Sequence, residues 1–146
     1  MEIFVDADAC PVRDIIYGEA HKRGIHIIMV VSMAHNIYEM AGMDVLRVDS
    51  SFQAVDIAIV NRASPQDIVV TSDFGLASLV LGNGVRALSP SGRIYSEQNI
   101  DSLLEKRHAS ARQRRGGGRV KGPKARRRED DDNFRKNLLK LMEEKI

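Results

Sequence analysis

The fold is decided by the opening stretch EIFVDADACPV, residues 2–12. Residues 2–6 form a short apolar run that ends in an acid, which favours a buried strand. Pro11 stands where proline is favoured, in the first turn of a helix that we expect over about residues 11–23. The chain therefore begins with a strand, a polar loop and a helix, in that order.

The same order recurs up to residue 108. Residues 25–31 (IHIIMVV) follow Gly24, an expected helix C-cap, and their branched apolar side chains predict a strand buried on both faces. We expect further strands over 45–48, 67–71 and 85–88, and a turn or small hairpin over 89–96. Helices are expected from about residue 36, over 52–62, over 74–81 and over 97–108. Ser50 or Ser51 is the expected N-cap of the helix over 52–62. Repeated strand and helix units predict an α/β fold, a three-layer α/β/α sandwich with a mainly parallel sheet.

The length of 146 residues allows one core and is too short for two ordinary domains. We expect an α/β domain over 1–108, followed by a basic Gly/Arg/Lys-rich segment over 109–129 that has too few apolar residues to fold alone. Residues 130–146 are expected to form an amphipathic helix that docks on the core or on a partner. Its apolar side is formed by Phe134, Leu138, Leu141 and Met142.

Charge is strongly segregated along the chain, although the net charge is only +2. Residues 1–105 carry 7 Lys or Arg against 14 Asp or Glu, residues 106–128 carry 11 against none, and residues 129–146 carry 4 against 6. The basic stretch is expected to bind the nucleic-acid backbone, RNA in particular, without base stacking because it holds no aromatic residue. The alternatives are a solvated tail and a segment folded back on the acidic core. The candidate contacts are Arg107, Arg112, Arg114, Arg115, Arg119, Lys121 and Lys124.

Cellular location is indicated by what the sequence lacks. Cys10 is the single cysteine and cannot form an intramolecular disulfide, which suits a reducing compartment. No apolar run approaches the roughly 18 residues of a membrane span, and no basic leader precedes the first strand. We expect a cytoplasmic protein without a membrane partner, and its oligomeric state stays open, a homodimer included. Zinc spacing and phosphate loops of the Walker type are absent from the sequence.

Acidic residues follow two of the expected strands. Asp6 and Asp8 close the first strand, and Asp73 follows the strand over 67–71. The carboxyl ends of parallel strands share one rim, where open sheets bind ligands. Asp56, in the helix over 52–62, can reach the same rim as a further ligand or as the base that positions water. We therefore expect four carboxylates to converge.

Converging carboxylates repel one another unless a cation lies between them. Oxygen ligands suit Mg²⁺ or Mn²⁺, which also accept a substrate phosphate. Other roles stay open at each position: Asp8 and Asp73 can cap helices, and Asp56 can be a solvated helix residue. Asp49 is the lesser candidate because it can simply cap the helix over 52–62. Loop side chains that can contact a phosphate are Ser32, His35, Asn36 and Ser72, although for His35 alone an ordinary exposed loop histidine is the preferred account.

Several segments together resemble the YaiI/YqxD family of uncharacterised bacterial proteins, and the resemblance covers nearly the whole chain. They are DADACPV at 6–12, Asp56 before IAIV, DIVVTSDFGLA at 67–77, GNGVRALSPSGRIYS at 82–96, and the basic pattern from Arg107 to GGGRVKGPK. That family is similar to a branch of the PIN/NYN-like nucleases. The resemblance implies a PIN-like fold and assigns Asp6, Asp8, Asp56 and Asp73 as metal ligands and catalytic residues.

Three functions follow from these patterns. The favoured one is an Mg²⁺- or Mn²⁺-dependent nuclease that hydrolyses phosphodiester bonds, in RNA above all. The second is a non-catalytic RNA-binding protein with a PIN-like fold, because the late aspartate of typical PIN domains has no counterpart between Asp73 and Glu97. The third is a phosphatase of the haloacid dehalogenase type with Asp6 as nucleophile, which lacks its usual lysine because none lies between Lys22 and Lys106.

Overall fold

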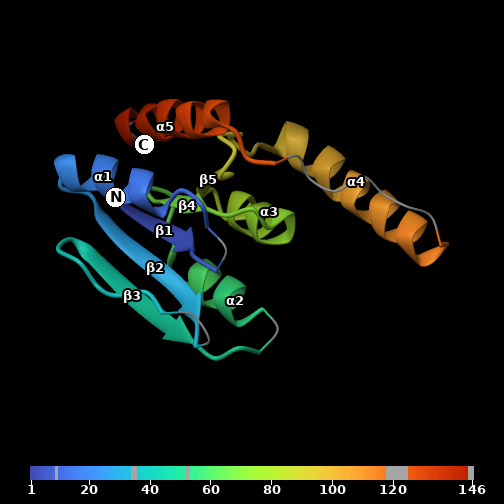
Figure 1. Ribbon diagram of the computed structural model, residues 1–146, viewed down its shortest axis with the longest axis horizontal. Coiled ribbons are helices and arrows are strands. Elements are labelled where there is room, and N and C mark those ends of the chain that lie inside the picture. Colours follow the sequence, from blue (N-terminus) through green and yellow to red (C-terminus); the bar gives the residue numbers. More distant parts are fainter. Residues whose placement is uncertain (9, 34–35, 52, 118–124, 145–146) are drawn as a thin grey trace.

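A five-stranded parallel sheet forms the centre of the protein in a computed structural model that describes residues 1–8, 10–33, 36–51, 53–117 and 125–144 (Figure 1). The predicted α/β sandwich with a parallel sheet is confirmed. The elements in chain order are β1 (Glu2–Asp6), α1 (Arg13–Lys22), β2 (His26–Ser32), β3 (Met43–Val48), α2 (Ala54–Arg62), β4 (Ile68–Val70), α3 (Phe74–Gly82), β5 (Arg86–Leu88), α4 (Glu97–Arg115) and α5 (Arg128–Glu143).

The strand order β3-β2-β1-β4-β5 places β1 in the middle of the sheet. Asp6 of β1 is in register with Val30 of β2, and Val5 is in register with Val70 of β4. The chain runs outward from β1 to β3 and then returns to start β4 on the other side of β1. The direction of winding therefore reverses beside β1, and open α/β sheets bind ligands at the carboxyl ends of strands at such a point.

Side chains of β1 alternate between two cores, one on each face of the sheet. Ile3 and Val5 pack with the buried side chains of α1 and α5, whereas Phe4 packs with those of α2, α3 and α4. This alternation follows from the two-residue period of a strand. Because both faces are covered at the centre of the sheet, β1, β2 and β4 are mostly apolar, which is what made them recognisable in the sequence, whereas the edge strand β3 carries Asp44 and Arg47.

Helix α5 docks on the core, which settles the two options that its amphipathic pattern left open. Phe134, Leu138, Leu141 and Met142 are all buried in the hydrophobic cluster that also contains the buried side chains of α1.

Across the described residues, no helix is both long enough and apolar enough to pass through a bilayer.

One expected helix is absent: residues 36–40 form a loop that ends in a bridge between Met40 and Met43. Side chains take the place of helical hydrogen bonds there. Arg47 donates to the carbonyl of Ile37, which is itself buried, and the Tyr17 hydroxyl donates to the carbonyl of Ala41. Tertiary contacts thus override the local helical pattern.

Helix boundaries also differ from the prediction, most clearly in α1, α2 and α4. Helix α1 starts at Arg13 with Val12 as N-cap, so that Pro11 precedes the helix and is not in its first turn. Helix α2 starts at Ala54, and its N-cap is Gln53, which has a φ of 65°, and not either of the two predicted serines. Helix α4 continues to Arg115, well past the expected end at residue 108.

The turn between β5 and α4 supports α5 directly, as a small hairpin with a bridge between Leu88 and Ile94. Gly92 in this turn has a φ of 97°, and a Cβ there would lie 2.7 Å from the backbone carbon of Asn133 and 2.8 Å from the backbone nitrogen of Phe134. Backbone atoms cannot move aside as a flexible side chain can. The close approach of α5 to the core therefore requires glycine at this position.

Replacing Gly92 by alanine is expected to destabilise the protein by about 2 kcal/mol more than the same change at Gly24. Both glycines have a positive φ, but a Cβ at Gly24 would meet nothing within 4 Å, so the Gly24→Ala variant isolates the cost of backbone strain alone. Urea unfolding of both variants measures the difference. Equal losses of unfolding free energy in the two variants would show that the close contact between Gly92 and the backbone of α5 does not affect stability.

Candidate functional site

All four predicted acids, Asp6, Asp8, Asp56 and Asp73, line a single cavity of about 500 Å³. It lies at the carboxyl ends of β1 and β4, where the winding of the sheet reverses. Asp6 is the last residue of β1, and Asp73 lies between β4 and α3. Topology therefore brings together acids that are up to 67 residues apart in the chain. The cavity is also lined by Ser32, Asp49, Ser50, Ser51, Gln53, Gly75, Leu79 and Arg107.

Asp6 is the most strongly perturbed acid of the site. Its Oδ2 accepts a hydrogen bond from the Thr71 hydroxyl at 2.7 Å. The pKa of Asp6 is raised from 3.8 to about 6, mainly by burial and to a smaller extent by the charges of Asp56, Asp73 and Asp8, while the Thr71 hydrogen bond opposes the rise. Each of the other three acids therefore acts on Asp6 electrostatically, as expected for carboxylates that share a cavity.

Asp8 ties the segment after β1 to the end of β2. The backbone N–H of Ser32 donates to both carboxylate oxygens of Asp8, at 3.1 and 3.3 Å. The predicted alternative, a helix-capping role for Asp8, is wrong because the N-cap of α1 is Val12. Asp8 lies beyond the end of β1 rather than on the strand with Asp6, and it still reaches the cavity.

Asp73 serves two purposes. Its Oδ1 accepts from the backbone N–H groups of Gly75 at 2.8 Å and Leu76 at 3.3 Å, so it is the N-cap of α3, as the alternative account of this residue predicted. It also faces the cavity, where Nη1 of Arg107 lies 3.6 Å from the same oxygen. Capping and a place in the acidic cavity are thus compatible.

Asp56 lies in the first turn of α2, nearer the helix start than the predicted boundary implied. Burial and the charge of Asp73 raise its pKa, while Arg107 lowers it. These effects place Asp56 among the charges of the cavity, not on a freely solvated helix face. Asp49 accepts from the backbone N–H of Ser51 at 2.6 Å and does not cap α2.

Thr71 was not predicted, although it connects two of the acids. Its hydroxyl donates to Asp6 and accepts from the backbone N–H of Asp73 at 3.0 Å. Thr71 is buried, and its backbone N–H donates to the carbonyl of Leu88. The available signal was its position directly after a buried strand and two residues before Asp73, which places it beside the end of β1.

The donor chemistry of the cavity fits a hard divalent cation, because carboxylate oxygens predominate. The described residues nonetheless contain no group of three or more His, Cys, Asp or Glu side chains already arranged to hold a metal ion. Each of Asp6, Asp8 and Asp73 is instead held by hydrogen bonds to protein groups. The cavity thus offers suitable ligands without a preformed coordination shell.

The predicted nucleic-acid contacts fall in different places. Ser32 lines the acidic cavity, and Arg107 lies against Asp73. Ser72 lines a neighbouring cavity with Ser89, Ser91, Arg93 and Arg126. Arg112 and Arg115 are exposed on the last turns of α4. The side chain of Arg114 and the residues Arg119, Lys121, Lys124 and His35 lie outside the part of the chain that the structure describes.

Comparisons with known proteins agree over the whole chain. A UPF0178 protein of Clostridium novyi is 45% identical over 142 residues, which are 97% of this chain and 95% of the relative. A UPF0178 protein of Exiguobacterium sibiricum is 43% identical over 145 residues, 99% of each chain, and one of Alkaliphilus metalliredigens is 40% identical over 146 residues, 100% of this chain and 94% of the relative.

No solved structure is significantly similar to the chain. A family model with the description "Uncharacterized BCR, YaiI/YqxD family" matches residues 4–144. This match includes the segments at 6–12 and 67–77 that carry the resemblance. The chain therefore belongs to the YaiI/YqxD family, whose relatives carry the name UPF0178.

Proposed function

We propose that this protein is an Mg²⁺- or Mn²⁺-dependent nuclease that hydrolyses phosphodiester bonds in RNA. The observation that carries the proposal is the convergence of Asp6, Asp8, Asp56 and Asp73 on one cavity where the winding of the sheet reverses. Four acids gathered at a ligand-binding position of the fold are unfavourable without a cation, and the charges of the other three acids add to the effect of burial in raising the pKa of Asp6.

Asp6, Asp8 and Asp73 would hold the cation, and Asp56 would complete the set or orient the attacking water. A bound Mg²⁺ or Mn²⁺ would supply an activated water and neutralise charge on the leaving oxygen. Thr71 fixes the rotamer of Asp6 and the backbone of Asp73 through its single hydroxyl. The N–H groups of α3 fix the side chain of Asp73. These hydrogen bonds fix the side chains of Asp6 and Asp73 at the acidic cavity.

Arg107 is the only Lys or Arg side chain among the described residues that line the cavity. Its position would allow it to contact the substrate. Its guanidinium lies 3.6 Å from Asp73, beyond hydrogen-bonding distance, and is more than half exposed. A guanidinium in this position can turn from the carboxylate to a phosphate oxygen, which it binds with two parallel hydrogen bonds. We assign Arg107 to the phosphate next to the cleaved bond.

The second half of α4 extends this cationic surface away from the core (Figure 1). Ile100 and Leu103 anchor the start of α4 in the core, whereas the basic arm, residues 106–115, holds five Lys or Arg residues and no acid. The arm starts beside the acidic cavity, because Arg107 lies in both. A single strand held along the arm would thus be led to the acids.

Replacing Arg112 and Arg115 of the basic arm by glutamine is expected to make RNA binding less dependent on salt. Each lost phosphate contact removes about 0.7 from the slope of log affinity against log salt concentration, so the double variant should lose about 1.4. Fluorescence anisotropy with a labelled single strand measures the slope. The double variant Lys22→Gln, Lys136→Gln removes the same charge elsewhere, and an equal loss of slope in that variant would refute a specific role of the arm.

A non-catalytic RNA-binding protein is the second candidate, and the absence of a preformed metal cluster among the described residues favours it. The resemblance to PIN-like nucleases also lacks the late aspartate after Asp73. The phosphatase alternative is weaker, because the described lining of the cavity includes no lysine to bind the phosphate.

The deciding experiment is incubation of the purified protein with labelled single-stranded RNA in Mg²⁺, in Mn²⁺ and in chelator. The nuclease predicts cleavage with either metal and intact RNA in chelator. The binding protein predicts equal RNA affinity in all three conditions and no cleavage in any. Trapping of a phosphoryl group on Asp6 with a phosphate ester would instead support the phosphatase.

A further inference from the structure

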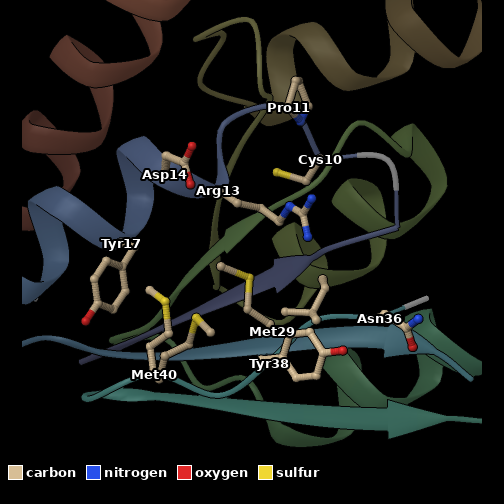
Figure 2. Close-up of a pocket in the computed structure, with 11 residues that line it drawn as sticks. Cys10, Pro11, Arg13, Asp14, Tyr17, Met29, Asn36, Tyr38 and Met40 are labelled. Carbon is tan, nitrogen blue, oxygen red and sulfur yellow. The ribbon is translucent and has the colours of Figure 1, made fainter.

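A second cavity, of about 430 Å³, lies beside the segment that joins β1 to α1, which contributes Cys10 and Pro11 to its lining (Figure 2). Its lining comes from the start of α1, from β2 and from the loop between β2 and β3. No residue assigned above to the acidic cavity lines it. The proposed nuclease chemistry therefore leaves this cavity without a role.

Tyr38 dominates the open side of this cavity, because 79% of its surface is exposed. A ring exposed to this extent has a free face on which a flat ligand can stack. Figure 2 shows its ring beside Met29, which is buried in β2, and shows Met40 on the same wall. The cavity thus has an aromatic face and soft thioether walls, surfaces that a flat aromatic ligand can contact.

Arg13 supplies a positive charge to the same space. It is the first residue of α1 and lines the cavity, and Figure 2 shows its side chain extending from α1, with the guanidinium near Cys10 in this view. Arg13 is exposed, and within the described part of the chain it makes no hydrogen bond or ion pair, so its guanidinium can reach a ligand. A guanidinium plane and an aromatic ring that line one cavity are the two side-chain types on which unpaired bases stack.

Polar groups at the rim suit the edge of a base. Asp14 and Asn36 line the cavity, and their side chains offer a carboxylate and an amide. Such groups form hydrogen bonds with ring N–H groups and exocyclic amines of bases. A purely apolar ligand would leave them without partners and would bury them at a cost.

The two cavities are neighbours along one chain segment. Asp8 lines the acidic cavity and Cys10 lines the second one, so their Cα atoms are at most about 7.6 Å apart, from the fixed spacing of two peptide units. The chain around the end of β2 contributes to both as well, with Ser32, the last residue of β2, in the first cavity and Asn36, in the following loop, in the second. One single strand can therefore reach both cavities.

We propose that this second cavity binds a nucleobase of the single-stranded RNA whose phosphodiester bond lies at the acidic cavity, with the base stacked on Tyr38 and Arg13. The inference rests on the proposed function, since it takes the same RNA as ligand. The basic arm can bind phosphates of paired or unpaired RNA, whereas the second cavity would bind only an unpaired base. Duplex RNA, whose bases are stacked inside the helix, cannot fill the cavity.

The test is binding of single-stranded RNA in chelator, where cleavage cannot interfere. Tyr38→Ala should weaken binding about tenfold, whereas Tyr38→Phe, which keeps the ring, should bind like the wild type. Ile57→Ala removes a comparably exposed apolar side chain from α2 and should change nothing. An oligonucleotide with abasic sites, which keeps every phosphate, should bind the wild type and Tyr38→Ala equally weakly.

A matched pair on α1 tests the guanidinium. Arg13→Gln should lose the preference for RNA with bases over abasic RNA, while Lys22→Gln, which removes an equal charge from the other end of the helix, should keep it. Because Tyr38 and Arg13 are both exposed, circular dichroism should show an unchanged fold in each variant.

The outcomes separate the two proposals. If the wild type binds RNA and cleaves it with metal, but Tyr38→Ala binds as well as the wild type, the base site is refuted and the nuclease stands. If the wild type binds RNA with bases and abasic RNA equally, the base site is refuted again. If the wild type binds no RNA, both proposals fail together.

Discussion

Replacing Asp6 or Asp73 by asparagine is expected to lower metal-dependent cleavage of RNA by about 100-fold or more, because each variant removes a charged ligand from the proposed cation site. Both substitutions preserve the local structure. Asn at 6 can still accept from the Thr71 hydroxyl, and Asn at 73 is among the best helix N-caps for α3. The loss should therefore come from charge and not from unfolding.

Initial cleavage rates in Mn²⁺ measure this effect, and calorimetric titration with Mn²⁺ alone gives a readout that does not depend on activity. Both should weaken together. Asp101→Asn changes an exposed acid of α4 outside the cavity and should keep the wild-type rate and the wild-type affinity for Mn²⁺. Wild-type rates in both site variants would contradict the assignment of these acids.

The same Asp6→Asn variant is expected to be more stable than the wild type by about 2 kcal/mol at pH 7.5. Burial, together with the charges of the neighbouring acids, raises the pKa of Asp6 in the folded protein from 3.8 to about 6, so the folded state binds the proton more tightly than the unfolded state does. Ionisation of Asp6 therefore costs stability as the pH rises from about 4 to about 6. Above pH 6 the full cost is present, and below pH 4 none of it is.

Urea unfolding of the wild type and the variant at several pH values measures the difference. The gain in the Asp6→Asn variant should be near zero at pH 4, grow through pH 5 and level off above pH 6.5. Saturating Mg²⁺ should shrink the gain at pH 7.5, because a cation that binds only the folded wild type stabilises it. A gain that does not vary with pH would mean that Asp6 carries no desolvation cost.

Together these two expectations describe one compromise. An acid that is unfavourable in the folded protein is kept at the end of the central strand, where removal improves stability and removes activity. Such opposition between stability and function is common where charges are gathered for ligand binding.

Much of the fold could be predicted because its strands are buried on both faces. A continuous apolar run as short as residues 25–31, bounded by Gly24 and a polar loop, favours a buried strand, and the alternation of such runs with helices favours a parallel sheet. The helix expected from residue 36 was wrong because a local pattern carries no information about tertiary contacts. Arg47 and Tyr17, both distant in sequence, hold that segment as a loop.

The end of α4 lies beyond its predicted position for a different reason. The charge of residues 109–115 favours disorder when composition alone is considered, yet the stretch SARQRR consists mainly of residues that favour a helix, with no glycine before Gly116. The helix therefore continues until the glycines begin. Composition thus identified the basic segment, but it did not predict that residues 109–115 continue helix α4.

The acids of the site were predictable because topology places them, whereas their partners were not. Any parallel sheet with this strand order brings the ends of β1 and β4 to the same rim, and so brings Asp6 near Asp73. The hydrogen bond from Thr71 to Asp6 and the approach of Arg107 to Asp73 depend on side-chain rotamers and on the path of α4. Periodicity and motif spacing carry no information about either.

The central claim is that the acidic cavity binds a divalent cation, and a crystal soaked in Mn²⁺ tests it most directly. Anomalous scattering should give a peak within coordination distance of Asp6 and Asp73, with the other two acids, Asp8 and Asp56, beside it or linked to it by water. A map with no peak at this cavity under Mn²⁺ concentrations that support cleavage, or with the only peak elsewhere on the protein, would contradict the account.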